Sequence, residues 1–594
     1  MRSAPESSLK KALKACRESF ISVGFFSLFI NALMLVPTFY MLQVYGRVIT
    51  SGSLTTLAML TLIMIALVIT LGSLEWIRSR IMVRVSTRLD VLLSRQVYRA
   101  SFKRALDSGG MDASAQSLND LTGLRQFLSG NGLFAFFDAP WLPIYIAVMF
   151  LFHPWFGWVA TGSALLLLAL AVLNERLTGP ALAQANKEHI GATLHTTKNL
   201  RNAEVIESMG MLETLMDRWG RRQRNVLLLQ SLASDRGAII STLSRTFRLL
   251  VQSLVLGLGA YLAVDHQVGA GLVFAGSVLL GRALAPIDLI IGSWKGFIAA
   301  RSQYGRLNDV LDKLQAQPER MSLPAPQGHV QVENLVVAAP GSRTPIIKNI
   351  SFSAPAGCTV GIIGPSAAGK STLARALIGV WPPQHGVVRL DGADISAWDK
   401  QELGPYIGYL PQDIELFEGT VGENIARFAE VDSAKVILAA MTAGVHEMIL
   451  LLPDGYDTVI GSEGIMLSAG QRQRIGLARA LYGSPRLIIL DEPNSNLDDV
   501  GDRALAGAVQ QLKLTGATLF VITHRTNIVS QLDRLMVLNA GVISIYGPRE
   551  HVLAELNAQR QQAQTPAVPA TSGVASVDAG KGESDEPCGA PSSN

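Results

Sequence analysis

The sequence predicts two fused parts: an α-helical membrane domain with six spans, followed by an α/β domain that contains a glycine-rich loop. Three observations lead to this prediction. Charge is almost missing from long windows of the first half, and strand-like segments alternate with helix-like segments in the second half. The glycine-rich loop lies between one such strand and the following helix.

The composition of the 594 residues excludes several classes of protein. Hydrophobic residues make up 49% and charged residues 16%, against about 25% charged in soluble globular domains. A mainly disordered chain is excluded, because disorder requires few apolar residues and much charge. The net charge of +4 is small for this length and does not suggest a nucleic acid partner. Cys16, Cys358 and Cys588 are too few for a disulfide framework and too far apart for a metal site, which fits a reducing compartment.

Three windows of the first half are nearly free of charge. The only formally charged residues are Arg47 in 20–74, Asp138 in 126–174 and Asp265 in 249–281. Each window can hold two helices of about 20 residues, the length that crosses a bilayer core of about 30 Å. Buried helices of a soluble core and a cleaved signal peptide are the alternatives, and the length and number of the apolar runs argue against both. The predicted spans lie near 21–44, 54–75, 129–151, 155–174, 239–263 and 268–292.

Basic residues predict the orientation of these spans. The connections 76–127 and 175–237 carry nine Lys and Arg each, whereas the short connections carry only Arg47. Because basic residues stay on the cytoplasmic side, both long connections and both chain ends are expected there. Apolar residues at helical spacing predict that the membrane helices continue into the cytoplasm, joined by short transverse helices at 109–123 and 208–215.

The residue pattern of the sequence changes after about residue 323. Short β-branched runs at 330–337, 359–363, 487–490 and 519–522 alternate with helical stretches, which predicts a largely parallel sheet. The expected organisation is an N-terminal cytoplasmic segment at 1–19, a transmembrane domain at 20–322, an α/β domain at 323–556 and a disordered tail at 557–594.

The glycine-rich loop matches the pattern GxxxxGK[ST]. Its backbone N–H groups and the following helix N-terminus can bind phosphates, Lys370 can reach the β- and γ-phosphates, and Ser371 can reach a Mg²⁺ ion. The pattern also occurs by chance, so its context matters. The residues expected to contact a nucleotide are Gly364, Pro365, Ser366, Ala367, Ala368, Gly369, Lys370, Ser371 and Thr372.

An apolar strand at 486–490 ends in two carboxylates, Asp491 and Glu492. In proteins with this loop, an Asp at this place holds Mg²⁺. An adjacent Glu suits a residue that polarises an attacking water. The alternative is an exposed acidic strand end.

A resemblance now becomes specific. Residues 467–471 read Leu-Ser-Ala-Gly-Gln and resemble the signature motif of ABC-transporter ATPases. Gln412 matches the Q-loop of that family, residues 496–498 its D-loop and His524 its switch histidine. With the glycine-rich loop and the Asp491-Glu492 strand, these motifs follow one another in the family's order. The whole chain resembles the half-transporter layout of ABC exporters, with six spans followed by one ATPase domain.

The resemblance implies that two copies of the chain form a homodimer that binds two ATP molecules between them. Each ATP would contact the loop of one copy and Ser468, Gly470 and Gln471 of the other. Glu492 would act as general base, and His524 would contact the γ-phosphate. Gln412 would connect Mg²⁺ to the membrane domain, so that the expected Mg²⁺ ligands are Ser371, Gln412 and Asp491. The expected activity is ATP hydrolysis coupled to transport.

The sequence departs from the family at two places. The aromatic residue that stacks on adenine is expected near 338–339, where the sequence reads Val-Val-Ala-Ala-Pro over 336–340. Without that ring, a contribution of about 1–3 kcal/mol would be missing, by analogy with base stacking on aromatic side chains. Ala469 replaces a glycine of the signature motif, which is a small change.

The chain resembles one branch of the family in particular. Segments 137–144, 204–211, 281–288 and 338–341 are similar to the protease-secretion (PrtD-like) branch of type I secretion ATPase/permeases. This implies export of unfolded proteins with a C-terminal signal across a bacterial inner membrane. The expected partners are a periplasmic membrane-fusion adaptor, an outer-membrane channel, the secreted substrate and membrane lipid. The alternatives are export of lipid or small amphipathic molecules, and a nucleotide-sensing membrane regulator.

Charged residues in or near the spans are costly if they face lipid. Arg245, Arg248, Arg282 and Asp288 are therefore expected to line a polar pathway or to form structural pairs between helices. Asp138, which lies close to two prolines, is expected to have a structural role.

Overall fold

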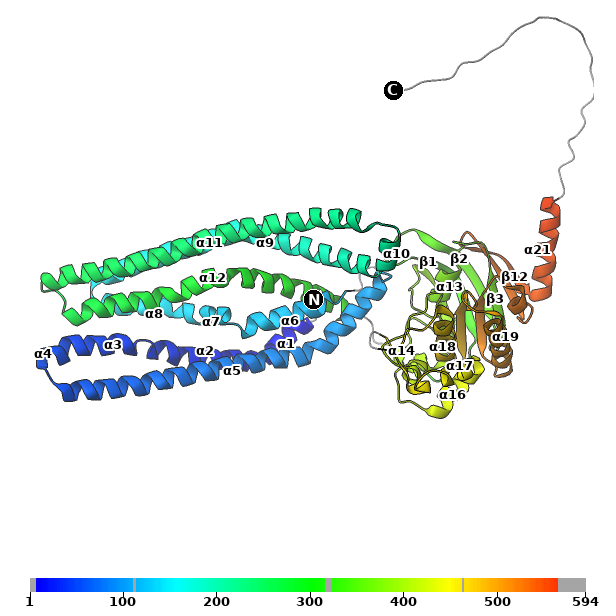
Figure 1. Ribbon diagram of the computed structural model, residues 1–594, viewed down its shortest axis with the longest axis horizontal. Coiled ribbons are helices and arrows are strands. Elements are labelled where there is room, and N and C mark those ends of the chain that lie inside the picture. Colours follow the sequence, from blue (N-terminus) through cyan, green and yellow to red (C-terminus); the bar gives the residue numbers. More distant parts are fainter. Residues whose placement is uncertain (1–6, 111–113, 316–321, 462–463, 565–594) are drawn as a thin grey trace, which may run out of the picture. The chain divides into compact units, whose positions relative to one another are not determined.

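The computed structural model describes residues 7–110, 114–315, 322–461 and 464–564. The chain divides into two compact units, residues 1–319 and 320–594, close to the change expected at 322–323. The first unit is built from helices and the second contains the strands, as the sequence predicts (Figure 1). The helices of the first unit are α1 (Ser8–Ala15), α2 (Arg17–Leu33), α3 (Val36–Gln43), α4 (Ile49–Ser51), α5 (Leu54–Asp107), α6 (Gln116–Ser129), α7 (Asn131–Asp138), α8 (Leu142–Phe152), α9 (Pro154–Leu200), α10 (Ala203–Ser208), α11 (Leu212–Val264) and α12 (Ala270–Gln315).

The six predicted spans are confirmed in the described residues. Six stretches are long and apolar enough to cross a membrane: Arg17–Ser51, Leu54–Asp107, Gly132–Phe152, Pro154–Leu200, Leu212–Val264 and Ala270–Leu314. α5 has 54 residues, which at 1.5 Å per residue is about 80 Å and exceeds the membrane core of about 30 Å. The helices therefore continue beyond the spans, as expected.

The two halves of α5 differ in how they are covered. No residue of its most apolar window is buried, as expected for a surface that faces lipid. Beyond that window, residues three or four apart become buried, from Met82 through Leu89 and Leu93 to Val97. This spacing places one stripe of the extension against its neighbours. The continuation of the helix is thus stabilised by packing and not by lipid.

The first and third spans are interrupted where proline enters. α2 ends at Leu33, and Pro37 lies in the first turn of α3. Proline lacks an N–H group and its ring clashes with the carbonyl four residues earlier, here that of Leu33. A π-helical turn at Val44–Val48 then leads into α4. In the third span, Pro140 lies in a 3₁₀ turn between α7 and α8.

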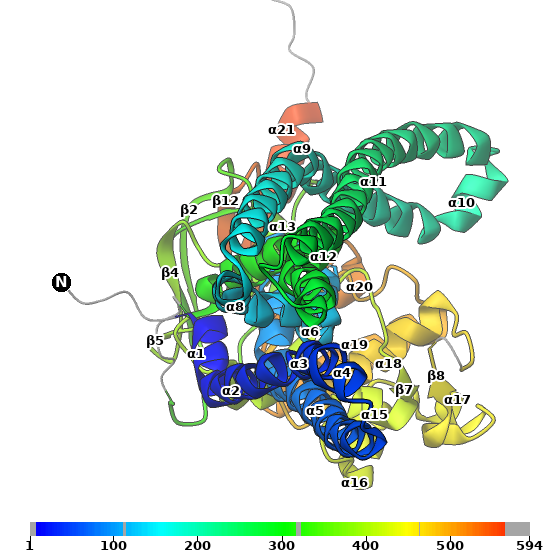
Figure 2. The same ribbon diagram turned by 90° about the vertical axis from the view of Figure 1, so that its left-hand side faces the viewer.

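α12 lies in the middle of the first unit. Figure 2 shows it surrounded by α3, α6, α8 and α11. More than half of its apolar window is buried, the largest share among the six spans of the described residues. Short helices lie near both predicted positions: α6 overlaps the end of 109–123, and α10 ends at Ser208, where the second short helix was expected to begin.

The second unit contains a six-stranded sheet in the order β12-β11-β3-β10-β9-β6, parallel except for β12. A four-stranded antiparallel sheet, β2-β1-β4-β5, was not predicted from the sequence. The strands are β1 (Val330–Ala338), β2 (Pro345–Ala354), β3 (Thr359–Ile363), β4 (His385–Leu390), β5 (Ala393–Asp394), β6 (Ile407–Leu410), β7 (Gly419–Thr420), β8 (Val459–Ile460), β9 (Leu487–Asp491), β10 (Thr518–Ile522), β11 (Arg534–Asn539) and β12 (Val542–Pro548).

Helices cover the sheets and connect the parallel strands. Every residue of β9 and of β10 is buried, which explains their continuous apolar sequences, since helices cover both faces of a parallel sheet. The helices of this unit are α13 (Lys370–Leu377), α14 (Lys400–Leu403), α15 (Val421–Ile425), α16 (Ser433–Thr442), α17 (His446–Leu450), α18 (Ala469–Leu481), α19 (Asp499–Leu514), α20 (Thr526–Val529) and α21 (Arg549–Gln564).

The tail expected at 557–594 is only partly described. α21 is helical through Gln564, so the first residues of that segment continue a helix instead of beginning a disordered tail. The remaining residues, 565–594, lie outside the described part of the chain.

Candidate functional site

Four neighbouring parallel strands bring the sequence motifs together. β3 ends at Ile363, directly before the glycine-rich loop, and β10 ends two residues before His524. β9 ends at Asp491, and β6 ends two residues before Gln412. These strands are adjacent in the order β3-β10-β9-β6, so their carboxyl ends meet at one edge of the sheet, where α/β folds bind their ligands.

The glycine-rich loop adopts the geometry that its glycines allow. A Cβ at Gly364 would lie 2.1 Å from the carbonyl oxygen of Leu538, so no other residue fits there without a backbone shift. Gly369 has a φ of 98° and precedes α13, which begins at Lys370. The ammonium of Lys370 donates to the carbonyls of Gly364 at 2.8 Å and Pro365 at 3.0 Å, which holds it back over the loop.

Asp491 is buried, and neither of its carboxylate oxygens has a hydrogen-bond partner in the described residues. Burial raises the pKa of Asp491, and the charge of Glu492 raises it further. The Ser371 hydroxyl lies close enough to lower that pKa without reaching hydrogen-bond geometry. A buried carboxylate with both oxygens free, next to a hydroxyl, is the donor set that Mg²⁺ takes in sites that also hold phosphates. These residues therefore fit the expected ion.

The structure brings the three predicted catalytic residues together. The amide Nε2 of Gln412 donates to Oε2 of Glu492 at 3.1 Å, and Nε2 of His524 lies 3.9 Å from Oε1 of the same carboxylate. Glu492 itself has a φ of 50°, in the left-handed region that non-glycine residues rarely adopt. Its backbone N–H donates to the carbonyl of Ile522 at 3.0 Å, which fixes this turn at the end of β9.

The signature residues lie at the start of α18. The hydroxyl of Ser468 accepts from the backbone N–H of Gln471 at 3.2 Å, and Oε1 of Gln471 accepts from the backbone N–H of Ser468 at 2.9 Å. This reciprocal pair is a capping box. In the described part of the chain, neither side chain makes a hydrogen bond to residues 364–372. Within a single chain, the loop therefore lies at the same sheet edge as Asp491 and Glu492, whereas in the described residues it has no hydrogen bond to the side chains of Ser468 and Gln471.

Sequence reasoning missed Gln473. This side chain is 2% exposed, and its Nε2 donates to the carbonyls of Glu492 at 3.3 Å and Pro493 at 2.5 Å. Its Oε1 accepts from the backbone N–H of Asn496 at 2.9 Å. Gln473 thus ties the signature helix to the segment that follows Glu492. The available signal was a polar residue on the buried face of α18, among Ile475, Gly476 and Leu477.

The region expected to stack on adenine contains only small and aliphatic residues. Val337 and Ala338 are buried at the end of β1, and Ala339 begins the turn that follows. Weaker binding of the base stays a prediction.

Asp138 belongs to a buried polar network between helices of the first unit, as expected for a structural role. Its Oδ1 accepts from Arg78 at 3.0 Å and from Asn31 at 2.8 Å. The hydroxyl of Tyr145 donates to the carbonyl of Asn31 at 2.9 Å, and the guanidinium of Arg78 lies 4.3 Å from the ring centre of Phe134. The network connects α2, α5, α7 and α8.

The second charged cluster divides into paired and unpaired residues. Asp288 accepts a hydrogen bond from Ser244 and forms an ion pair with Arg248. Arg245 and Arg282 are exposed, and neither makes a hydrogen bond or an ion pair in the described residues. Of the two expectations for these residues, a structural pair between helices is therefore what Arg248 and Asp288 form.

Comparisons with known proteins agree with this geometry. The family of the ABC transporter transmembrane region matches residues 20–285, and the ABC transporter family matches residues 347–495. The chain is 43% identical over 92% of its length to the type I secretion system ATP-binding protein PrsD of Rhizobium meliloti (strain 1021), of which it covers 94%. It is 27% identical over 91% of its length to the leukotoxin translocation ATP-binding protein LktB of Mannheimia glucosida, of which it covers 77%.

The fold agrees as well. A solved bacterial Atm1-family ABC exporter with ATP bound superimposes with a TM-score of 0.76 at 22% identity, over 93% of this chain and 100% of the other. Together with the matches over both units, these relationships show that the chain belongs to the ABC transporter family. Within that family it is an exporter and is one of the type I secretion ATP-binding proteins.

Proposed function

We propose that a homodimer of this chain hydrolyses ATP to export unfolded proteins across a bacterial inner membrane, as the ABC component of a type I secretion system. The observation that carries the proposal is the meeting of Gln412, Glu492 and His524 at the sheet edge that bears the glycine-rich loop. It occurs in a chain 43% identical to a type I secretion system ATP-binding protein.

In this proposal the loop residues 364–372 bind the phosphates of ATP through backbone N–H groups, and Lys370 adds its positive charge. Ser371, Gln412 and Asp491 would hold Mg²⁺, which neutralises charge on the phosphates. Glu492 accepts a proton from the attacking water, Gln412 orients that carboxylate through its 3.1 Å hydrogen bond, and His524 donates to the γ-phosphate.

The dimer supplies the groups that one chain keeps apart. Ser468, Gly470 and Gln471 begin a helix of 13 residues, whose N-terminal N–H groups are suited to an anion. Since their hydrogen bonds do not reach the loop of their own chain, we assign them to the nucleotide bound by the partner copy.

The cargo is a protein with a C-terminal secretion signal, and the further partners are a periplasmic adaptor and an outer-membrane channel. The names of the relatives, a type I secretion protein and a leukotoxin translocation protein, support a polypeptide cargo over a lipid or a small molecule. The ATPase domain and both chain ends lie in the cytoplasm, and lipid surrounds the six spans.

The test compares the proteins in the culture medium of a strain that carries the wild type with those of its Glu492→Gln variant. Loss of one or a few proteins from the medium, with retention in the cells, supports protein export and identifies the cargo. The exposed Glu430→Gln is the matched control and should secrete normally. An unchanged set of secreted proteins, with ATP hydrolysis lost, would contradict the proposal and favour lipid or small-molecule export.

A further inference from the structure

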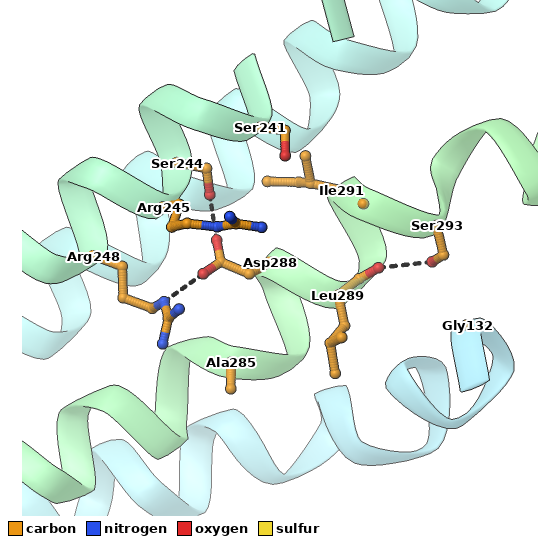
Figure 3. Close-up of a pocket in the computed structure, with 11 residues that line it drawn as sticks. Gly132, Ser241, Ser244, Arg245, Arg248, Ala285, Asp288, Leu289, Ile291 and Ser293 are labelled. Atoms are coloured by element: carbon orange, nitrogen blue, oxygen red, sulfur yellow. Dashed lines mark hydrogen bonds and ion pairs between the residues drawn. The ribbon is translucent and has the colours of Figure 1, made fainter. Parts of the chain in front are cut away.

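A cavity of about 520 Å³ lies between α7, α11 and α12 of the first unit (Figure 3). Its polar lining comes from three serines, two arginines and one aspartate: Ser241, Ser244, Ser293, Arg245, Arg248 and Asp288. Ala285, Leu289 and Ile291 provide its apolar surface. A cavity of this volume can hold a ligand the size of several amino-acid side chains. A lining that combines polar and apolar residues is typical of ligand-binding sites.

The only carboxylate in this lining is already neutralised. Asp288 accepts from Ser244 with one oxygen and pairs with Arg248 through the other. Both contacts are drawn in Figure 3. Asp288 and Arg248 thus cancel each other's charge and leave little negative charge for a second cation.

Arg245 is therefore the uncompensated charge of the cavity. It makes no hydrogen bond or ion pair anywhere in the described ranges of the chain. Figure 3 shows its guanidinium extending into the space between Ser241 and Asp288. The Ser241 hydroxyl likewise makes no hydrogen bond to the described residues. A positive charge and a free hydroxyl thus face the same space.

Arg245 lies next to the most apolar part of its helix. It lies four residues before the nearly charge-free window that begins at 249, and a charged residue in or near a span is costly where it faces lipid. Such a residue normally faces the protein interior and finds a partner. Here the interior provides a cavity without a carboxylate for it.

We propose that Arg245 binds carboxylate groups of a polypeptide segment that occupies this cavity. A guanidinium offers parallel N–H groups that match the two oxygens of a carboxylate. The serine hydroxyls can bond to peptide groups of the same segment, while Leu289 and Ile291 contact its apolar side chains. The inference rests on the proposed function, since it assigns a binding site for the exported chain. Anionic lipid headgroups carry a similar charge and are distinguished by the test.

The test uses the full-length protein in phosphatidylcholine nanodiscs. The probes are two fluorescent ten-residue peptides with blocked ends, made of alanine, serine and leucine with either two glutamates or two glutamines. Binding is followed by fluorescence anisotropy. The wild type should bind the glutamate peptide about ten times more tightly than the glutamine peptide, as a charge-assisted hydrogen bond provides.

Variants then assign this preference to one residue. Arg245→Gln should bind both peptides equally, and Arg245→Lys should keep part of the preference because it keeps the charge. Arg224→Gln removes an exposed arginine from the cytoplasmic part of the same helix and should behave as wild type. Equal binding of the two peptides by the wild type, or an Arg245→Gln protein that keeps the preference, would overturn the proposal. The first of these results needs no variant, so it stands even if Arg245→Gln fails to fold.

A separate experiment tests whether the cavity binds a lipid headgroup instead. Native mass spectrometry with phosphatidylglycerol would overturn the proposal in favour of a lipid site if Arg245→Gln reduced lipid binding while the wild type did not distinguish the peptides. The proposed function fails separately. If Glu492→Gln abolishes secretion while Arg245→Gln secretes normally and keeps the peptide preference, export stands and only the Arg245 site is rejected.

Discussion

The side chain of Gln473 accepts a hydrogen bond of 2.9 Å from the backbone of Asn496, across 23 residues of sequence. Through this contact and its bonds to the carbonyls of Glu492 and Pro493, the signature helix is fixed to the segment that carries the expected general base. The position of Glu492 therefore depends on a residue that touches no expected ligand.

Replacing Gln473 by leucine should lower ATP hydrolysis and stability together. The change leaves buried backbone groups unpaired, which costs about 1–3 kcal/mol for each. The measurements are ATPase activity and the thermal unfolding midpoint of the purified full-length protein. Gln511→Leu, on the exposed face of α19, is the control. Wild-type activity and an unchanged midpoint in Gln473→Leu would contradict this role.

Gly364→Ala should abolish ATP binding. Its Cβ would come within 2.1 Å of the Leu538 carbonyl oxygen, so the loop must shift away from β11. Gly516→Ala is the matched control, because it has a φ of 72° but no atom within 4 Å of the added Cβ; it tests backbone strain of about 1–3 kcal/mol alone. Titration with a fluorescent ATP analogue distinguishes the two. Equal ATP affinities of the two variants would mean that the close contact is unimportant.

Ala339→Tyr should strengthen nucleotide binding. A ring at this position would supply the base stacking that is missing from 336–340, which is about 1–3 kcal/mol and corresponds to a Kd about 5- to 140-fold lower. The affinity for ATP is measured with hydrolysis blocked by Glu492→Gln. Ser342→Tyr, at an exposed position of the same turn, should leave the Kd unchanged. No change in Ala339→Tyr would place the base elsewhere.

Asp138→Asn should destabilise the first unit. Arg78 is 6% exposed, and removing the charge of its partner leaves a buried cation uncompensated, at a cost of about 3–5 kcal/mol. The double variant Arg78→Met/Asp138→Leu removes both charges and should recover most of this loss. Thermal unfolding in nanodiscs measures both. A double variant less stable than Asp138→Asn would indicate that the pair is more than a matched set of charges.

Asp533 should make the stability of the ATPase domain depend on pH. Burial acts to raise its pKa, but hydrogen bonds from Lys513 and Thr359 outweigh it, so the pKa of Asp533 lies below the usual 3.8. A carboxyl with a lowered folded-state pKa stabilises the fold above its unfolded pKa, and this contribution is lost as the pH falls through the folded-state value.

Asp533→Asn should therefore unfold at a lower temperature than wild type at pH 7, and the difference should shrink below about pH 4. Thermal unfolding midpoints over a pH series test this. Asp413→Asn, at an exposed position, provides the control and should follow the wild type throughout. A difference that is constant with pH would mean that the lost contacts do not depend on the charge of Asp533.

The sequence allowed prediction of those parts of the site that are encoded locally. The loop 364–371, the pair Asp491-Glu492 and His524 each follow or end a strand that the sequence predicted, whereas the strand before Gln412, β6, was not predicted and Gln412 was found through its family motif. The number of spans could also be predicted, because each charge-free window is a local feature of the sequence.

Contacts between distant segments could not be predicted in this way. The partner of Asp138 is Arg78, 60 residues away, and many arginines of the first half were equal candidates. Gln473 gave no signal apart from its place on a buried helix face. The antiparallel sheet depends on the pairing of β1 with β4, which no short motif specifies.

The interruptions in the helices have a mechanical consequence. α5 is unbroken from Leu54 to Asp107 and behaves as a stiff rod, so a tilt at one end becomes a sideways movement at the other. The first and third spans instead contain joints, at Pro37 and Pro140. Bending of the membrane domain should concentrate at these two joints, while α5 acts as a lever.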